Sequence, residues 1–158
     1  MSEADIQEVV TVLRSDWLTQ GPVVPKFEAA VASLVGCKHA VAVNSATSAL
    51  HLACRALDIG IGDVVWTSPI SFVASSNCAL YCGASIDFVD IDIDTYNMDL
   101  VKLEEKLELA DRDGTLPKCI IPVHLAGRPC EMSAIYKLSQ KYGFHIIEDA
   151  SHAIGSSS

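Results

Sequence analysis

The chain has 158 residues, 50% of them hydrophobic, and its formal net charge is −9 at pH 7. This composition excludes a disordered chain and predicts one folded domain with a sizeable core. The negative charge argues against nucleic-acid and anionic-membrane surfaces, because the mean field repels phosphates. No run approaches the roughly 20 apolar residues of a membrane span, and the acidic start differs from a basic secretory signal, so a cytoplasmic location is expected.

Two helical patterns, at residues 3–16 and 25–35, come before any predicted strand. The segment 17–22 that joins them contains Gly21-Pro22, which breaks helices. We therefore expect a turn, or an arm laid over another part of the molecule, at this joint.

Short β-branched or apolar runs then alternate with helical patterns. The clear predicted strands are residues 40–43, 64–67, 85–89, 119–123 and 145–147, and 91–93 is a weaker one. Repetition of strand, helix and strand implies parallel pairing with helices on both faces. The predicted fold class is α/β, a three-layer α/β/α sandwich with a mainly parallel sheet.

Helices are predicted between these strands from the spacing of apolar residues. They span residues 47–57, 72–82, 100–109 and 132–142. Gly36, Gly60, Gly83 and Gly143 each follow a helical pattern, where a left-handed cap is favoured. These glycines predict where the helices end.

The six cysteines include no Cys-x-x-Cys pair, and most lie within apolar stretches. In a cytoplasmic chain such thiols are more often small core residues than metal ligands or disulfides. Cys78 and Cys82 are spaced to share a helix face, but no further ligands accompany them. Asp90, Asp92 and Asp94 lack the glycine and glutamate of a calcium loop, so a solvated edge strand is preferred and no metal site is predicted.

Polar and aromatic residues follow the first two predicted strands, at the edge where open α/β sheets bind ligands. Thr47 and Ser48 open a helix, where hydroxyls and backbone N–H groups can hold a phosphate. An ordinary N-cap has the same residues and is favoured when the motif is taken alone. Phe72 begins another helix, where it can stack on a planar ring, although packing in the core is the plainer alternative.

Further polar residues follow the last two predicted strands. Asp149 ends the final strand, and a carboxylate there can hold a proton on a heterocyclic nitrogen or orient a histidine or metal. A helix cap or loop acid is the alternative, with His152 as a surface residue. His124 is another polar residue at this edge. The sequence has neither the glycine-rich dinucleotide fingerprint nor a Gly-x-Ser-x-Gly elbow, which disfavours dinucleotide binding and serine hydrolysis.

A phosphate cradle, a stacking aromatic residue and a strand-end acid, in this order, suit pyridoxal phosphate. At this point the sequence resembles the DegT/DnrJ/EryC1/StrS family of sugar aminotransferases, on fold-type I of the pyridoxal enzymes. The resemblance runs almost from end to end and is carried by residues 17–22, 40–52, 67–74, 88–92, 122–127 and 148–155. Within the family, segments 65–70 and 77–84 resemble the pseudaminic acid branch, which aminates C4 of a UDP-linked 4-keto-6-deoxy-N-acetylhexosamine.

The resemblance implies pyridoxal 5'-phosphate as cofactor and a role for each matching residue. Thr47 and Ser48 would bind the phosphate, Phe72 would cover the ring, Asp149 would pair with the ring nitrogen and His152 would lie near the phenolic oxygen. The resemblance also implies a UDP-sugar substrate, glutamate as amino donor and a homodimer.

The same resemblance implies that residues 1–36 form an N-terminal helical arm and that residues 37–158 form part of a large cofactor-binding domain, without its later strands and the small domain. In the family the Schiff-base lysine lies downstream of the acid and histidine. All seven lysines of this chain precede Asp149. We therefore expect the N-terminal part of an aminotransferase, with no catalytic lysine and no activity by itself.

Two alternatives stay open from the sequence. A sugar dehydratase of the same family, in which histidine replaces the lysine, fits every residue present, although the resemblance of segment 66–70 favours the transaminase. A non-catalytic module that binds pyridoxal phosphate, a sugar nucleotide or a partner protein is the second alternative, because an incomplete sheet would expose apolar surface.

Overall fold

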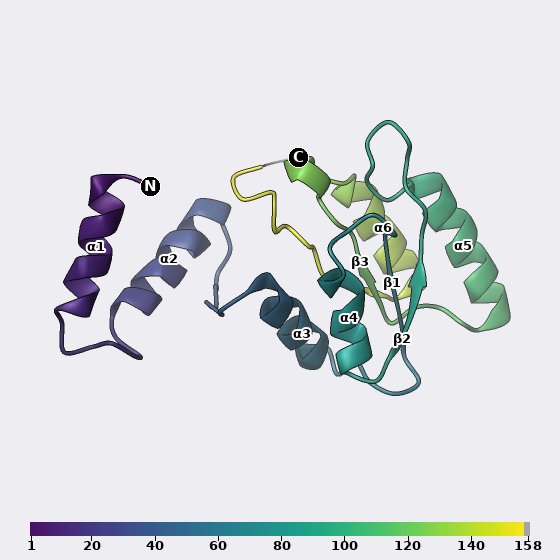
Figure 1. Cartoon of the computed structure of the whole chain (residues 1–158). Helices are drawn as coiled ribbons and strands as arrows, with labels where there is room; N and C mark the ends of the chain where they lie inside the picture. The colour runs from purple at the N-terminus through teal and green to yellow at the C-terminus, as the bar shows by residue number, and fades with distance from the viewer. Residues whose placement is uncertain (157–158) are drawn as a thin grey trace. The chain divides into compact units, whose positions relative to one another are not determined.

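The structure is a computed structural model that describes residues 1–156 (Figure 1). The backbone divides into two compact units, Met1–Ala42 and Val43–Ser158. No helix in the described part of the chain is long and apolar enough to cross a membrane.

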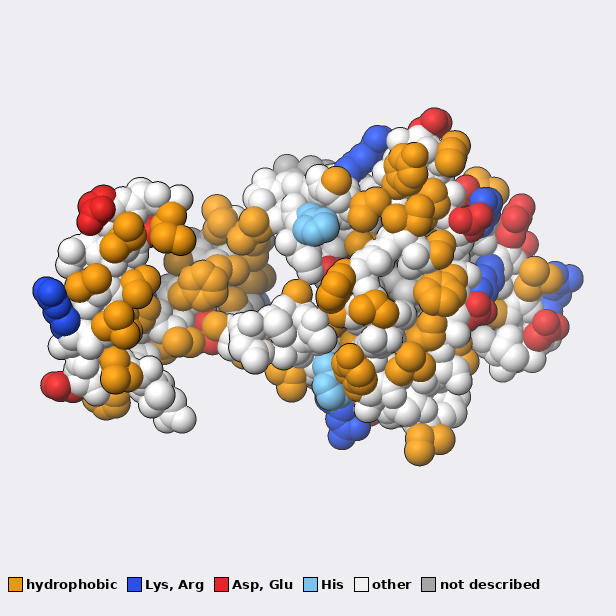
Figure 2. All heavy atoms as spheres, viewed as in Figure 1, with side chains coloured by type: hydrophobic (Ala, Val, Ile, Leu, Met, Phe, Trp, Pro, Cys, Tyr) orange, Lys and Arg blue, Asp and Glu red, His pale blue; other side chains and the backbone are white. Residues whose placement is uncertain are grey.

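The first unit contains helices α1 (Glu3–Leu13) and α2 (Val23–Val35). A capping box starts α1, in which Ser2 and Asp5 exchange hydrogen bonds between side chain and backbone. Neither helix has a buried residue, and Figure 2 shows orange apolar side chains gathered on both of them. Several large apolar side chains of these helices are exposed, among them Val9, Leu13, Phe27 and Leu34.

The predicted strand at residues 40–43 is wrong, because this segment has no regular secondary structure. The Ala42 N–H donates to Oε1 of Glu28 at 2.8 Å, whereas in a sheet it would donate to the carbonyl of a neighbouring strand. Val41 is 78% exposed. The run has the composition of a strand, but no strand among residues 1–156 pairs with it.

The second unit is built on a parallel sheet with the strand order β2-β1-β3-β4. Its strands are β1 (Val64–Thr67), β2 (Ser85–Phe88), β3 (Cys119–Ile121) and β4 (His145–Ile146). Each lies within a predicted run, and parallel pairing is confirmed. The bonding continues past the ends of two strands, since Val123 and Asp149 form a parallel bridge.

Helices cover both faces of this sheet, which confirms the three-layer sandwich (Figure 1). The side chains of a strand alternate between faces, so Val65 packs in one core cluster while Trp66 packs in the other. The first cluster takes residues from α3 (Ala46–Ala56) and α4 (Ala74–Tyr81). The second takes residues from α5 (Leu100–Asp113) and α6 (Met132–Tyr142).

The structure differs from the predicted connections at two places. Gly60 does not form a left-handed cap, because α3 ends earlier and Asp58 takes the positive φ of 51° instead. Residues 91–93 are not a strand, since Ile91 forms only an isolated antiparallel bridge to Met98. Asp90, which precedes that segment, is paired with Lys102 at 2.8 Å.

Candidate functional site

A cavity of about 490 Å³ lies at the carboxyl ends of β1, β3 and β4. It is lined by Ala46, Thr47, Leu50, Ser71, Phe72, Ala74, Val123, His124, Leu125, Asp149, Ser151 and His152. These residues come from the start of α3 and from the segments that follow the strands. Parallel strands all end at one edge, which is why segments far apart in the sequence meet here.

The α3 N-terminus contributes Thr47 to the cavity, whereas Ser48 is not among its lining residues. Ser45 is the N-cap, and its Oγ accepts from the Ser48 N–H at 3.1 Å. The Ser48 hydroxyl donates to Oδ1 of Asn44 at 2.7 Å. An ordinary N-cap is thus present at Ser45, and the backbone N–H groups of Ala46 and Thr47 have no partner in the described part of the chain.

Phe72 lies between β1 and α4, and its side chain is 73% exposed while lining the cavity. The core-packing alternative for Phe72 is therefore wrong. An exposed aromatic face beside an apolar wall is suited to stack on a planar ligand.

Asp149 is 6% exposed and follows β4. Its Oδ2 accepts from the Ser75 hydroxyl at 2.6 Å, and its Oδ1 accepts from the Ser151 hydroxyl at 2.6 Å and the Ser151 N–H at 3.2 Å. Its own N–H donates to the Pro122 carbonyl, and its carbonyl accepts from the His124 N–H. Asp149 is therefore a buried carboxylate fixed at the sheet edge, and its bond from the Ser151 N–H is one that a loop or capping acid also makes.

His124 is 5% exposed, and both of its ring nitrogens have partners. Nδ1 accepts from the Cys130 N–H at 3.1 Å. Nε2 therefore carries the proton of the neutral ring and donates to Oε2 of Glu148 at 2.9 Å. This arrangement fixes the imidazole in the cavity wall.

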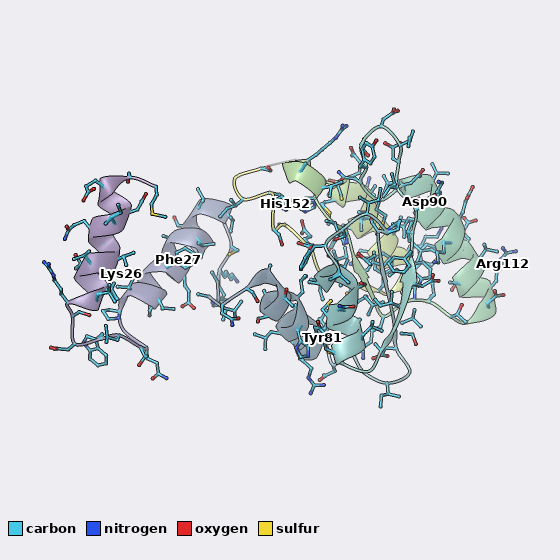
Figure 3. The ribbon with its side chains drawn as sticks, in the orientation of Figure 1. Lys26, Phe27, Tyr81, Asp90, Arg112 and His152 are labelled. Carbon is cyan, nitrogen blue, oxygen red and sulfur yellow. The ribbon has the colours of Figure 1, made fainter. Side chains whose placement is uncertain are left out.

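His152 lies on the segment after β4, is exposed, and lines the same cavity (Figure 3). A Cβ on Gly127 would come within 3.0 Å of the His152 carbonyl oxygen, so the backbones of these two segments approach closely. The absence of a side chain at Gly127 therefore allows the segment that carries His152 to lie against this loop.

The structure brings Thr47, Phe72, Asp149 and His152 to one cavity, while Ser48 lies beside it. Sequence reasoning missed Ser71, Ser75 and Ser151. Serines within or beside a helix carry no distinguishing pattern, and their link to Asp149 becomes visible only in three dimensions. No cluster of His, Cys, Asp or Glu in the described residues could hold a metal ion.

Comparison with known proteins identifies the family. The model of the DegT/DnrJ/EryC1/StrS aminotransferase family matches residues 1–158. This chain belongs to that family. It is 45% identical over 154 residues to the spore coat polysaccharide biosynthesis protein SpsC of Bacillus subtilis, covering 98% of this chain and 38% of SpsC.

Solved structures of aminotransferases share the fold of this chain. Helicobacter pylori PseC, an aminotransferase involved in the biosynthesis of pseudoaminic acid, matches with a TM-score of 0.91 and 35% identity, over 100% of this chain and 41% of PseC. The PLP-form of Spr1654, a putative sugar aminotransferase from Streptococcus pneumoniae, matches with a TM-score of 0.86 and 33% identity, over 98% of this chain and 42% of Spr1654.

The chain thus spans about two fifths of the length of these aminotransferases. Structures of Spr1654 in its PLP-form and PMP-form indicate pyridoxal phosphate dependence for the family. The predicted membership and fold class are confirmed.

Proposed function

We propose that this chain is the N-terminal part of a pyridoxal-phosphate-dependent aminotransferase that aminates C4 of a UDP-4-keto-6-deoxy-N-acetylhexosamine with glutamate as donor. The observation that carries the proposal is the buried Asp149 carboxylate in the wall of a cavity at the sheet edge. The likeness to PseC, an aminotransferase involved in the biosynthesis of pseudoaminic acid, supports the choice of sugar.

The residues around the cavity fit the cofactor in three respects. The volume of about 490 Å³ falls within the range of small-molecule sites, roughly 300 to 1,000 Å³. The backbone N–H groups of Ala46 and Thr47, at the N-terminus of α3, are free to donate hydrogen bonds to a phosphate. The hydroxyl of Ser48 lies next to them in the sequence. The exposed Phe72 side chain offers a face for the ring, and Asp149 offers an acceptor for a protonated ring nitrogen.

In this proposal the chain binds and orients the cofactor. When bound, pyridoxal phosphate supplies an electron sink for deprotonation of the amino donor at its α-carbon. Asp149 would accept the hydrogen bond of a protonated ring nitrogen, and the free N–H groups at the start of α3 would bind the phosphate. His152, which lines the cavity, would contact the phenolic oxygen. Residues 1–36 form the helical arm, and residues 37–158 form part of the large domain in a homodimer.

None of the seven lysines lines the cavity or follows Asp149 in the sequence. The chain by itself would therefore bind the cofactor only non-covalently. It offers no lysine amine in the cavity to form a Schiff base with the cofactor or to move a proton at the reacting carbon. We expect binding without turnover.

Binding is tested by mixing the chain with pyridoxal 5'-phosphate, measuring affinity by calorimetry, and mapping adducts by mass spectrometry after borohydride reduction. We expect reversible binding that Asp149→Ala weakens at least about tenfold, since a charge-assisted hydrogen bond is lost. Asp111→Ala removes an exposed acid from α5 and should leave the affinity unchanged. A stoichiometric reduced adduct at one lysine would overturn the expectation of no turnover.

The activity is tested in a chimera in which this chain replaces the matching 41% of Helicobacter pylori PseC. We expect the chimera to aminate the UDP-4-keto sugar with glutamate, detected as the amino sugar by mass spectrometry. Asp149→Ala should lower its kcat at least about a hundredfold, because it removes the charge opposite the ring nitrogen. A folded chimera that dehydrates the sugar without amination would favour the dehydratase alternative.

A further inference from the structure

The two oxygens of the Asp149 carboxylate differ in the hydrogen bonds that they accept. Oδ1 accepts from the hydroxyl and the N–H of Ser151, at 2.6 and 3.2 Å. Oδ2 accepts from the Ser75 hydroxyl alone, at 2.6 Å. A carboxylate oxygen has two acceptor positions, so Oδ1 is saturated and Oδ2 has one position left.

The Ser75 hydroxyl has a single proton and three polar neighbours. Its Oγ lies 2.6 Å from Oδ2 of Asp149, 3.1 Å from the Phe72 carbonyl oxygen and 2.6 Å from the Ser71 Oγ. The carboxylate is the strongest acceptor of the three, and the 2.6 Å distance is typical of a charge-assisted bond. The Ser75 proton therefore lies on the bond to Asp149, and Ser71 donates its proton to Ser75.

Burial makes this orientation rigid. Ser75 is fully buried near the start of α4, and Asp149 is 6% exposed. Neither group can exchange its partner for bulk water without losing a buried hydrogen bond. The direction of the whole series, from Ser71 through Ser75 to Asp149, is set by the protein.

We propose that Ser75 is a positioning residue that turns Oδ2 of Asp149 so that its remaining acceptor position receives the N–H of a protonated ring nitrogen. Ser71 supports this by orienting the Ser75 hydroxyl. This inference rests on the proposed function, because it concerns the ligand of the same cavity. Ser75, a residue of helix α4, would thus join Asp149 in selecting a ligand whose ring has a nitrogen facing Oδ2.

The first test compares two ligands, pyridoxamine 5'-phosphate and its analogue with CH in place of the ring nitrogen. Ser75→Ala should weaken binding of the first ligand about tenfold and leave the second within about twofold, because only the first donates to Oδ2. Ser76→Ala is the matched control, since Ser76 is the next residue of α4, is half-buried, and donates to the Val73 carbonyl without contacting Asp149. An equal loss for both ligands, or no loss, would overturn the proposal.

Ser71→Ala provides a second variant if Ser75→Ala does not fold, and it should weaken only the pyridoxamine ligand, by about threefold. Equal effects of Ser71→Ala on the two ligands would count against the inferred series of donors.

A cofactor-free measurement separates this proposal from the proposed function. A double-mutant cycle measures the unfolding equilibrium constant in urea for Ser75→Ala, Asp149→Ala and the double variant. Ser75→Ala should raise this constant about tenfold when Asp149 is present, and less than about threefold in the Asp149→Ala background. If the chain binds neither ligand, the cofactor proposal for this chain fails, and the cycle still decides on Ser75. Additive effects in the cycle would show that Ser75 does not act through Asp149.

Discussion

The six thiols of the chain lie in unlike surroundings, and these decide which of them can react. Cys37 is exposed, whereas Cys119 and Cys130 are buried. Burial raises the pKa of Cys130 to about 11 and that of Cys119 to about 12. The thiolate is the nucleophile, so at pH 8 only about one Cys130 thiol in a thousand is reactive even before access is considered.

We therefore expect iodoacetamide at pH 8 to label Cys37 much faster than the buried thiols of the folded chain, as followed by peptide mass spectrometry. Cys37→Ser should remove the fast phase, and unfolding in urea should bring all remaining thiols to similar rates. Fast labelling of Cys130 in the folded chain would contradict the burial that the structure shows.

At the residue scale, strand ends were the useful signal in the sequence. Thr47, Phe72 and Asp149 follow predicted strands, and the structure places all three around one cavity. Ser75 could not be found in this way, because its contact with Asp149 spans 74 positions and serine is common in helices. Ser48, unlike these three residues, does not line the cavity. Ser45 is the N-cap of α3, and its Oγ accepts from the Ser48 N–H.

At the element scale, helices are predicted well from apolar periodicity followed by a glycine. Strands are predicted less well from their composition. Helix α6 spans Met132–Tyr142 as predicted and ends at Gly143, whose φ is 79°. The run at residues 40–43 has strand composition, but composition cannot show whether a neighbouring strand is present. Its Ala42 N–H instead bonds to the Glu28 side chain.

Helix α5 depends on its N-cap, Asp99. The Asp99 Oδ1 accepts from the N–H groups of Val101 at 2.8 Å and Lys102 at 3.2 Å. Asp99→Ala leaves these donors without their partner and should lower the free energy of unfolding by about 1 kcal/mol. Urea denaturation measures this, with Asp111→Ala as the control for loss of an exposed acid from the same helix. Equal losses in the two variants would indicate that the cap contributes little.

At the scale of the whole molecule, an ion pair links the segments that come just before β1 and β3. The Lys118 ammonium donates to Oδ2 of Asp63 at 2.9 Å and to the Asp58 carbonyl at 2.6 Å. The hydrogen bond from Lys118, followed by that from the Gly60 N–H, holds the pKa of Asp63 below its ordinary value of 3.8. A carboxyl group with a lowered pKa stabilises the fold above that ordinary value, and the contribution is lost as the pH falls through the lowered pKa.

We accordingly expect Asp63→Asn to destabilise the chain at pH 7 and the difference from the parent chain to shrink below about pH 4. Urea midpoints measured between pH 2 and 7 give both quantities for the two chains. Asp94→Asn, a change at an exposed acid, is the control. A difference that stays constant down to pH 2 would contradict the assigned role of the Asp63 carboxylate.

The strand order β2-β1-β3-β4 also has a kinetic consequence. Ser75 bonds to Asp149 across 74 positions, and the Thr67 hydroxyl bonds to the Ile121 carbonyl across 54. Contacts of such separation form late, because closing long loops costs entropy before the contacts are made. We therefore expect the cavity to form only when β4 has docked. Its occupancy reports completed folding of the second unit, and a ligand bound there holds the last-formed contacts together.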